Sequence, residues 1–128
     1  MGEIADTRQF VSQKDVTPDA LNQRFRRLYN AVNRLEVRSI TAARTLDVTD
    51  DVVLCDASGA AFTVTLPTAA RIRGRTYTVK KTDSSGNAVT IDGAGTETID
   101  GAATVALSTQ NAFRTIVSNG TNWFVISS

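Results

Sequence analysis

The side chains of this chain that could do chemistry are carboxylates, arginines, lysines and a single cysteine, because its 128 residues include no histidine. Without histidine, a Ser-His-Asp triad, a Cys-His pair and a histidine-bearing metal site are all excluded. The one cysteine, Cys55, can form neither an intrachain disulfide nor a thiolate zinc site. Its apolar neighbours indicate a small buried side chain.

One group of carboxylates has the residue types of a glycosidase. Glu97 with Asp92 or Asp100 could supply the two carboxylates, which must lie about 5 to 9.5 Å apart across a cleft, usually beside aromatic sugar platforms. The chain has one tryptophan and two tyrosines, and the patterns around Trp123 and Tyr77 are typical of strand core positions. We therefore expect no enzyme and no catalytic residue.

Three further carboxylates, Asp50, Asp51 and Asp56, lie near a predicted turn and could attract Ca²⁺. The spacing of an EF-hand loop is absent, so solvated loop carboxylates are the better interpretation. We expect no metal and no cofactor.

The second half of the chain has one basic cluster, a candidate polar patch for ligand contact, formed by Arg71, Arg73, Arg75, Lys80 and Lys81. Few aromatic residues interleave with it and no nucleic-acid motif accompanies it, so nucleic acid is not an expected partner. Two other interpretations remain open, a solvated face and pairing with Asp83 and neighbouring acids across subunits.

Charge is balanced overall but unevenly distributed along the chain. The sequence has 14 Lys and Arg against 13 Asp and Glu. Between Thr17 and Arg44 there are six arginines against two acids, whereas Thr45 to Asp100 carries eight acids against five bases. This asymmetry indicates two structural segments. No run approaches the ~20 apolar residues of a membrane span, and the opening MGEIADTRQF lacks the apolar core of a signal peptide. We therefore expect synthesis in a cytoplasm and no membrane partner.

A helix is predicted after a polar arm at residues 1–16, with Thr17 as N-cap and Pro18 at its first position. The predicted helix runs to about Val37, and together with the linker that follows it occupies residues 17–44. A heptad-like seam of apolar residues lies on it, namely Leu21, Phe25, Leu28, Val32 and Leu35. Over so short a span, this seam fits either a short coiled coil that gathers several chains or an amphipathic helix lying on its own β-domain.

From Thr45 onward, apolar residues recur at every second position, as in half-buried strands joined by tight turns. Asn119-Gly120 between two such runs is a strong hairpin signal. Eight or nine short strands predict a small antiparallel β-sandwich or barrel at residues 45–128. The expected strands are 45–48, 52–56, 62–66, 75–81, 88–91, 97–99, 104–107, 113–118 and 122–126.

An ordered set of motifs spans roughly the last two-thirds of the chain. It comprises VLCDASG (53–59), FTVTLP (62–67), GRTYTVKKTD (74–83), AVTID (88–92), ETIDG (97–101) and SNGTNW (118–123). In this order the motifs resemble the β-domain of phage tail-fibre, head-fibre and related virion appendage proteins. Each motif alone is weak, and the succession is fairly specific.

The resemblance implies a trimer with an N-terminal attachment segment, hence an arm, a short trimeric coiled coil and a β-head. The expected function is that of a phage virion structural protein, a short fibre or spike-type appendage made in the bacterial cytoplasm. Its arm, residues 1–16, would bind a capsid, neck or tail protein. The alternatives are a host-attachment module that binds a surface glycan or protein receptor, and a capsid decoration or cement protein.

Overall fold

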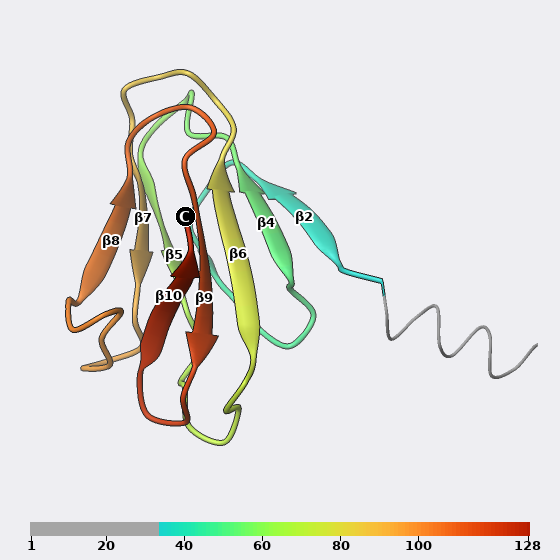
Figure 1. Cartoon of the computed structure of the whole chain (residues 1–128). Coiled ribbons are helices and arrows are strands. Elements are labelled where there is room, and N and C mark those ends of the chain that lie inside the picture. The colour runs from blue at the N-terminus through green and yellow to red at the C-terminus, as the bar shows by residue number, and fades with distance from the viewer. Residues whose placement is uncertain (1–33) are drawn as a thin grey trace, which may run out of the picture. The chain divides into compact units, whose positions relative to one another are not determined.

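The computed structural model describes residues 34–128, so the expected arm and most of the expected helix lie outside the described residues. Glu36–Ser128 forms one compact unit. Within the described part, nine strands make two sheets and there is no helix (Figure 1). The strands are β2 (Val37–Ile40), β3 (Arg44–Thr45), β4 (Val52–Cys55), β5 (Phe62–Thr65), β6 (Thr76–Lys81), β7 (Val89–Asp92), β8 (Thr104–Leu107), β9 (Phe113–Ser118) and β10 (Trp123–Ser127).

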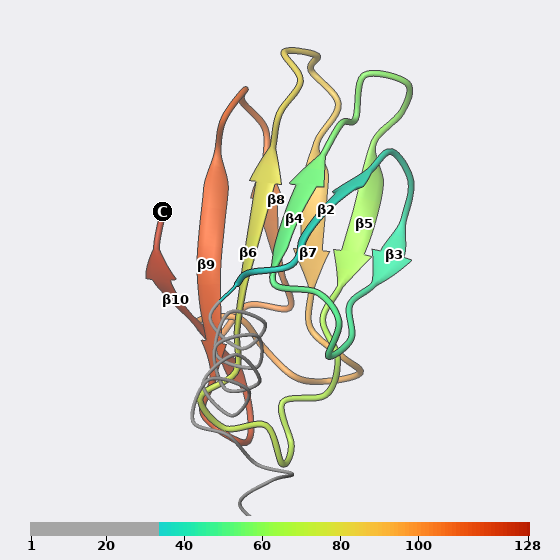
Figure 2. The same cartoon turned by 90° about the vertical axis from the view of Figure 1, so that its right-hand side faces the viewer.

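The chain passes from one sheet to the other after most of its strands. The five-stranded sheet has the order β10-β9-β6-β4-β2, and the four-stranded sheet has the order β3-β5-β7-β8. From β2 to β7 the chain alternates between them, so β2, β4 and β6 pair in parallel in one sheet and β3, β5 and β7 in the other. Strands β8, β9 and β10 then add antiparallel pairs. Figure 2 shows β2 and β3 together at one side and β10 at the opposite side.

The prediction of a mainly β fold is confirmed, whereas the prediction of a purely antiparallel sandwich is wrong. The alternation of apolar residues reports which face of a strand is buried, and it is the same for parallel and antiparallel partners. Parallel neighbours need a connection that returns the chain to the same end of the sheet. Here the strands of the opposite sheet serve as those connections, a feature that no local pattern indicates.

The sandwich also begins earlier than the expected boundary at Thr45. Residues 38–44, assigned to a linker, contain most of β2 and the start of β3, and each of these is an edge strand. Val37 and Ile40 are three residues apart and lie on opposite faces of β2, so they give no alternating pattern. The expected strand at 97–99 is reduced to isolated bridges of Ile99 with Ala102 and Trp123.

The predicted hairpin at Asn119-Gly120 is confirmed between β9 and β10. The N–H of Asn119 donates to the carbonyl of Asn122 at 3.1 Å, and Asn119 Oδ1 accepts from two backbone N–H groups of the loop. Gly120 has a φ of 93°, a left-handed conformation that favours glycine. The hairpin therefore lies where the sequence indicated, and its loop over residues 119–122 is held by the Asn119 side chain and the left-handed Gly120.

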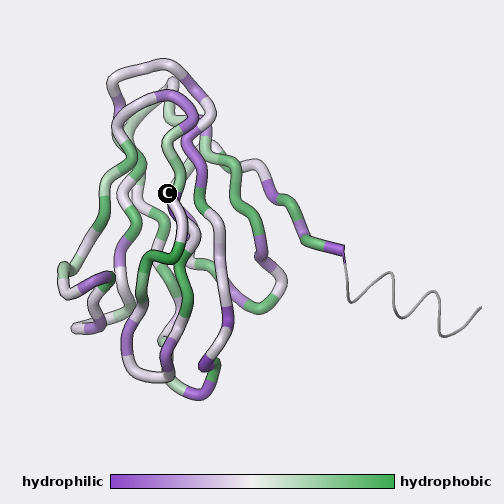
Figure 3. Tube along the Cα trace, in the orientation of Figure 1, coloured by the Kyte–Doolittle hydropathy of each residue, from purple (hydrophilic) through white to green (hydrophobic). Residues whose placement is uncertain are grey.

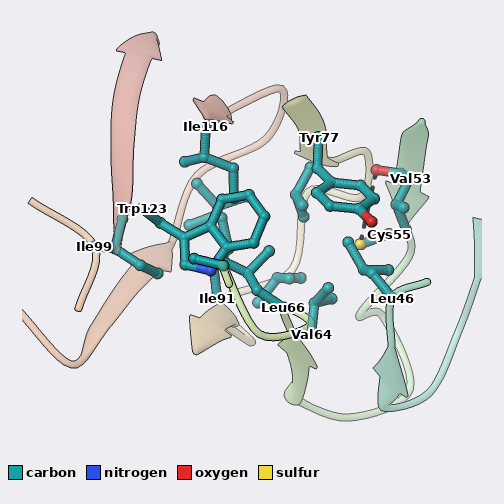
Figure 4. Close-up of a cluster of buried hydrophobic side chains, with 14 of the residues drawn as sticks. Leu46, Val53, Cys55, Val64, Leu66, Tyr77, Ile91, Ile99, Ile116 and Trp123 are labelled. Carbon is teal, nitrogen blue, oxygen red and sulfur yellow. Dashed lines mark hydrogen bonds between the residues drawn. The ribbon is translucent and has the colours of Figure 1, made fainter. Parts of the chain in front are cut away.

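One core lies between the two sheets. In strand β6, Tyr77 and Val79 are buried while Thr76 and Thr78 point the other way. Figure 3 shows hydrophobic segments recurring along strands of both sheets. Tyr77 and Trp123 are the largest buried side chains, with ring centroids 5.7 Å apart (Figure 4). Within the described part, Trp123 Nε1 is buried without a hydrogen-bond partner. The indole therefore stabilises the core by packing, and the desolvation of its unpaired N–H offsets part of that stabilisation.

Candidate functional site

The five residues of the predicted basic patch do not share one surface. Arg75 is half-buried. Its Nη1 donates to Asp51 at 2.8 Å, its Nη2 donates to the backbone carbonyls of Val48 and Asp50, and its guanidinium lies 4.5 Å from the centroid of the Tyr77 ring. Both terminal nitrogens of this arginine therefore fasten the loop between β3 and β4, while its Nε is buried without a hydrogen-bond partner within the described part.

The other four basic residues lie in three different environments. Lys81 is completely buried, with Nζ 2.7 Å from Asp83. Lys80 lies on the opposite face of β6, in register with Leu54 and Phe113. The remaining two, Arg71 and Arg73, are exposed on the loop between β5 and β6. Only these two lie near one another in sequence and are both exposed, so the structure leaves a pair of surface arginines in place of a five-residue patch.

Asp50 is the centre of a charged cluster that sequence reasoning missed. Its side chain is fully buried and accepts hydrogen bonds from Arg38 Nε at 2.6 Å, Arg44 Nη2 at 3.1 Å and the N–H of Asp47 at 3.1 Å. Arg38 is in β2 and Arg44 in β3, so one carboxylate ties the edge strands of both sheets to the same loop. The neighbouring Asp51 accepts the N–H of Glu36 at 2.8 Å.

The pKa of Asp50 reflects a competition between burial and these donors. Burial alone would raise it, but the hydrogen bonds from Arg38, the Asp47 N–H and Arg44 outweigh burial, and the pKa lies below its ordinary value. Asp50 is therefore ionised and neutralised by the two arginines. The sequence interpretation of Asp50 as a solvated loop carboxylate is wrong, because its partners lie 6 and 12 residues away in elements that only the fold brings together.

A second charged cluster surrounds Asp83, after β6. Asp83 accepts hydrogen bonds from Lys81 Nζ at 2.7 Å, from the N–H of Ala57 at 2.7 Å, and from the N–H and the hydroxyl of Ser85. Asn87 Nδ2 also donates to the carbonyl of Ala57 at 2.8 Å. The Lys81 hydrogen bond, followed by those of Ser85, holds the pKa of Asp83 far below its usual range. This cluster fastens the loop after β4 to the loop after β6.

The Asp83 cluster contains a serine and a lysine, whose hydroxyl and amine lie 3.4 Å apart at Ser85 and Lys81. A serine nucleophile with a lysine base needs an amine that is free to take the proton. Here the amine is bound to the Asp83 carboxylate, and the Ser85 hydroxyl donates to the same carboxylate. The arrangement is that of a structural ion pair.

The carboxylates considered for glycoside hydrolysis also hold loops. Glu97 accepts the hydroxyl of Thr68 at 2.6 Å and the N–H of Ala69 at 2.8 Å, and Asp100 accepts the N–H of Val125 at 3.0 Å. Both carboxylates thus hold backbone segments in place through hydrogen bonds. Cys55 is buried, and burial together with the charge of Asp83 raises its pKa to about 12, so its thiol stays neutral at physiological pH.

An open pocket of about 480 Å³ lies at the side of the unit, lined by residues 39–45 of the β2–β3 connection. Its one charged side chain, Arg44, is already bound to Asp50. Among residues 34–128, no cluster of carboxylate and cysteine side chains has the geometry to hold a metal ion. Over the same residues, no helix is long and apolar enough to cross a membrane.

The predicted assembly seam lies almost entirely outside the described residues. Leu35 alone falls within them, and it is largely exposed. The other four residues of the seam, Leu21, Phe25, Leu28 and Val32, stay predictions, as does the attachment arm at residues 1–16. In comparisons with known proteins, no family model and no curated protein matches this sequence.

Proposed function

We propose that this chain is a structural protein of a phage virion, a short trimeric fibre or spike-type appendage attached to the particle through residues 1–16. The observation that carries the proposal is the ordered set of motifs that resembles the β-domain of virion appendages. In the structure these motifs are strands β4, β5, β6 and β7 and the turns of a single sandwich, so they are consistent with one domain.

The use of charge within the β-head supports a mechanical role. The cluster around Asp50 fastens a loop to strands β2 and β3, and the cluster around Asp83 fastens the loop after β6 to the loop after β4. Bound on several sides, these carboxylates stiffen the head against local opening. A head of this kind suits a protein whose task is to project from a particle and keep its shape.

The proposed mechanism is multivalent attachment. Each arm contacts a capsid, neck or tail protein weakly, and the seam from Leu21 to Leu35 joins three arms into one molecule. Once one arm is bound, the other two meet their sites at a high effective concentration, so the assembly binds far more tightly than one arm alone.

The first test is the solution mass of the full chain, measured by light scattering on a sizing column. A mass of three chains is expected at micromolar concentration. Leu28→Asp places a charge at the centre of the seam and should convert the trimer to monomers, since a buried unpaired charge is costly. The matched control Arg27→Asp places the same charge at a predicted outer position and should leave the mass unchanged. A wild-type chain that is monomeric, or a Leu28→Asp variant that stays fully trimeric, would remove the seam from the proposal.

A further inference from the structure

The outer faces of the two sheets differ sharply in chemistry. In the four-stranded sheet, Val64 and Ile91 are buried, so their neighbours along β5 and β7 face outward. Cross-strand pairing aligns this outer face, which is made mainly of Thr45, Thr63, Thr65, Thr90, Asp92 and Thr104. Such a face is hydroxyl-rich and carries a carboxylate, as expected for a sheet surface that stays in water.

The outer face of the five-stranded sheet is apolar near both of its edges. The residues that alternate with the buried Val53, Tyr77 and Ile116 point away from the core. Six of them are large and apolar, and none packs against the core cluster: Val37, Val52, Leu54, Phe113, Val117 and Phe124. We call this surface the apolar outer face; this sheet is the one formed by β10, β9, β6, β4 and β2 in Figure 1.

The residues of the apolar outer face are arranged in register. Val37 lies opposite Val52, and Phe124 lies opposite Val117. Between these pairs, Thr78 is the central position, hydrogen-bonded through its hydroxyl to that of Thr115 at 2.9 Å. Lys80 is the one charged side chain among the outward positions of the five strands. A sheet face with six large apolar residues and one charge is typical of a surface buried in an assembly.

The position of the predicted seam indicates what covers this face. The seam ends at Leu35, and only Glu36 separates it from Val37, the first residue of β2. Strand β2 is an edge of the very sheet that carries the apolar outer face. A seam that gathers several chains around an axis would bring their β2 strands close to the same axis. We infer that the apolar outer face is buried between copies of this chain, packed around the axis of the assembly.

This inference rests on the proposed trimer, and the size of the face sets how much it contributes. Five strands about 4.8 Å apart, each up to six residues of about 3.4 Å, give a face of roughly 400 Å² per chain. A stable interface buries about 800 Å² per partner. The apolar outer face therefore reinforces an assembly that the seam holds together and would associate weakly alone.

Cross-linking of the full chain tests which face is shared. Thr78→Cys puts a thiol at the centre of the apolar outer face, and Thr90→Cys is the matched control at the centre of the other outer face. The native Cys55 is buried and neutral, so it is not a competing target. With a short bismaleimide at micromolar protein, Thr78→Cys should give covalent dimers on a denaturing gel, and Thr90→Cys should give none.

The outcomes separate this inference from the proposed function, because light scattering on the same samples reports the trimer independently. A trimer in which Thr78→Cys forms no dimer overturns the inference and leaves the proposed function standing. A reaction with single-ended maleimide but no dimer would mean an open face. Protection from both reagents that persists in the monomeric Leu28→Asp background would mean a face covered within one chain. Each result contradicts burial between copies. A monomeric wild-type chain would overturn both proposals.

A charge substitution gives a second readout. Thr78→Lys should raise the dissociation constant of the assembly about tenfold or more, because like charges would meet across the axis. Thr90→Lys, the matched control, should change it less than about twofold. Sedimentation equilibrium measures both, and Trp123 fluorescence reports whether each variant is folded. Equal effects of the two substitutions would contradict the inference.

Discussion

At the scale of single residues, the most informative side chains are two carboxylates that look like ordinary loop residues in the sequence. Asp50 is bound by two arginines and a backbone N–H, and Asp83 by a lysine, a serine and two backbone N–H groups. In each case the ionised form is favoured in the folded chain, and the pKa lies below its ordinary value. These groups therefore link stability to pH.

The sign of that link follows from the direction of both shifts. In the unfolded chain an aspartate has a pKa of about 3.9. The pKa values of Asp50 and Asp83 in the folded unit lie below it. The stabilisation is complete above the unfolded value and is lost as the pH falls through the folded pKa. The free energy of unfolding should be nearly constant from about pH 7 to 5 and should decline below about pH 4. Urea titrations followed by Trp123 fluorescence measure it, and stability unchanged down to pH 2 would contradict the two clusters.

Substitution separates the contribution of Asp50. Asp50→Asn removes the charge that faces Arg38 and Arg44 and should destabilise the chain by about 2 kcal/mol at pH 7, since it leaves charged donors poorly paired. Asp92→Asn, on the outer face of the four-stranded sheet, is the control and should change stability by less than about 0.5 kcal/mol. The Asp50→Asn variant should also show a weaker loss of stability in acid. Equal effects of the two substitutions would mean that the Asp50 cluster contributes little.

At the scale of elements, the chain folds by alternating between two sheets, so that parallel strands are joined through the opposite layer. Strands β2 and β3 are short edge strands, yet they carry Arg38 and Arg44, the two partners of Asp50. Their attachment therefore depends on an ion cluster as well as on the sheet ladder. A boundary placed at Thr45 would cut through this cluster.

Truncation tests that boundary. A fragment of residues 45–128 lacks both arginines that pair with Asp50, and removing one partner of a buried ion pair typically costs about 3–5 kcal/mol. We expect it to melt at a markedly lower temperature than residues 36–128, or to lack a cooperative transition. Thermal unfolding followed by circular dichroism measures the difference. Equal melting temperatures would show that β2 and β3 are dispensable and that the head begins at Thr45.

At the scale of the whole molecule, the two sides of the sandwich suit different environments. The threonine-rich outer face matches exposure to water, and the apolar outer face matches burial between copies. Assembly that uses the folded head would couple folding to association, because only the folded chain presents this face.

That coupling predicts a melting temperature that depends on concentration. Association with the folded state alone stabilises it by mass action, so the melting temperature of the full chain should rise as protein concentration increases. The Leu28→Asp variant, which should be monomeric, is the control and should melt at one temperature at all concentrations. Calorimetry over a hundredfold range of concentration tests this. A wild-type melting temperature independent of concentration would argue against the assembly.

The sequence by itself determined the local features of this protein. Alternation around Tyr77 and Val79 predicted a strand with a buried face, and Asn119-Gly120 predicted a hairpin, because both depend on residues close together in the chain. The burial of Cys55 was predicted for the same reason.

Only the tertiary structure decided which strands are neighbours and which charges meet. Parallel and antiparallel partners share the same alternation, so the sequence could not show that the chain winds between two sheets. Asp50 became buried and Arg75 half-buried because folding brings together groups from distant strands and loops, and the energy of a charge depends on those neighbours. The apolar outer face emerged in the same way, since six apolar residues scattered from Val37 to Phe124 share one surface only after four strand pairings have set their register.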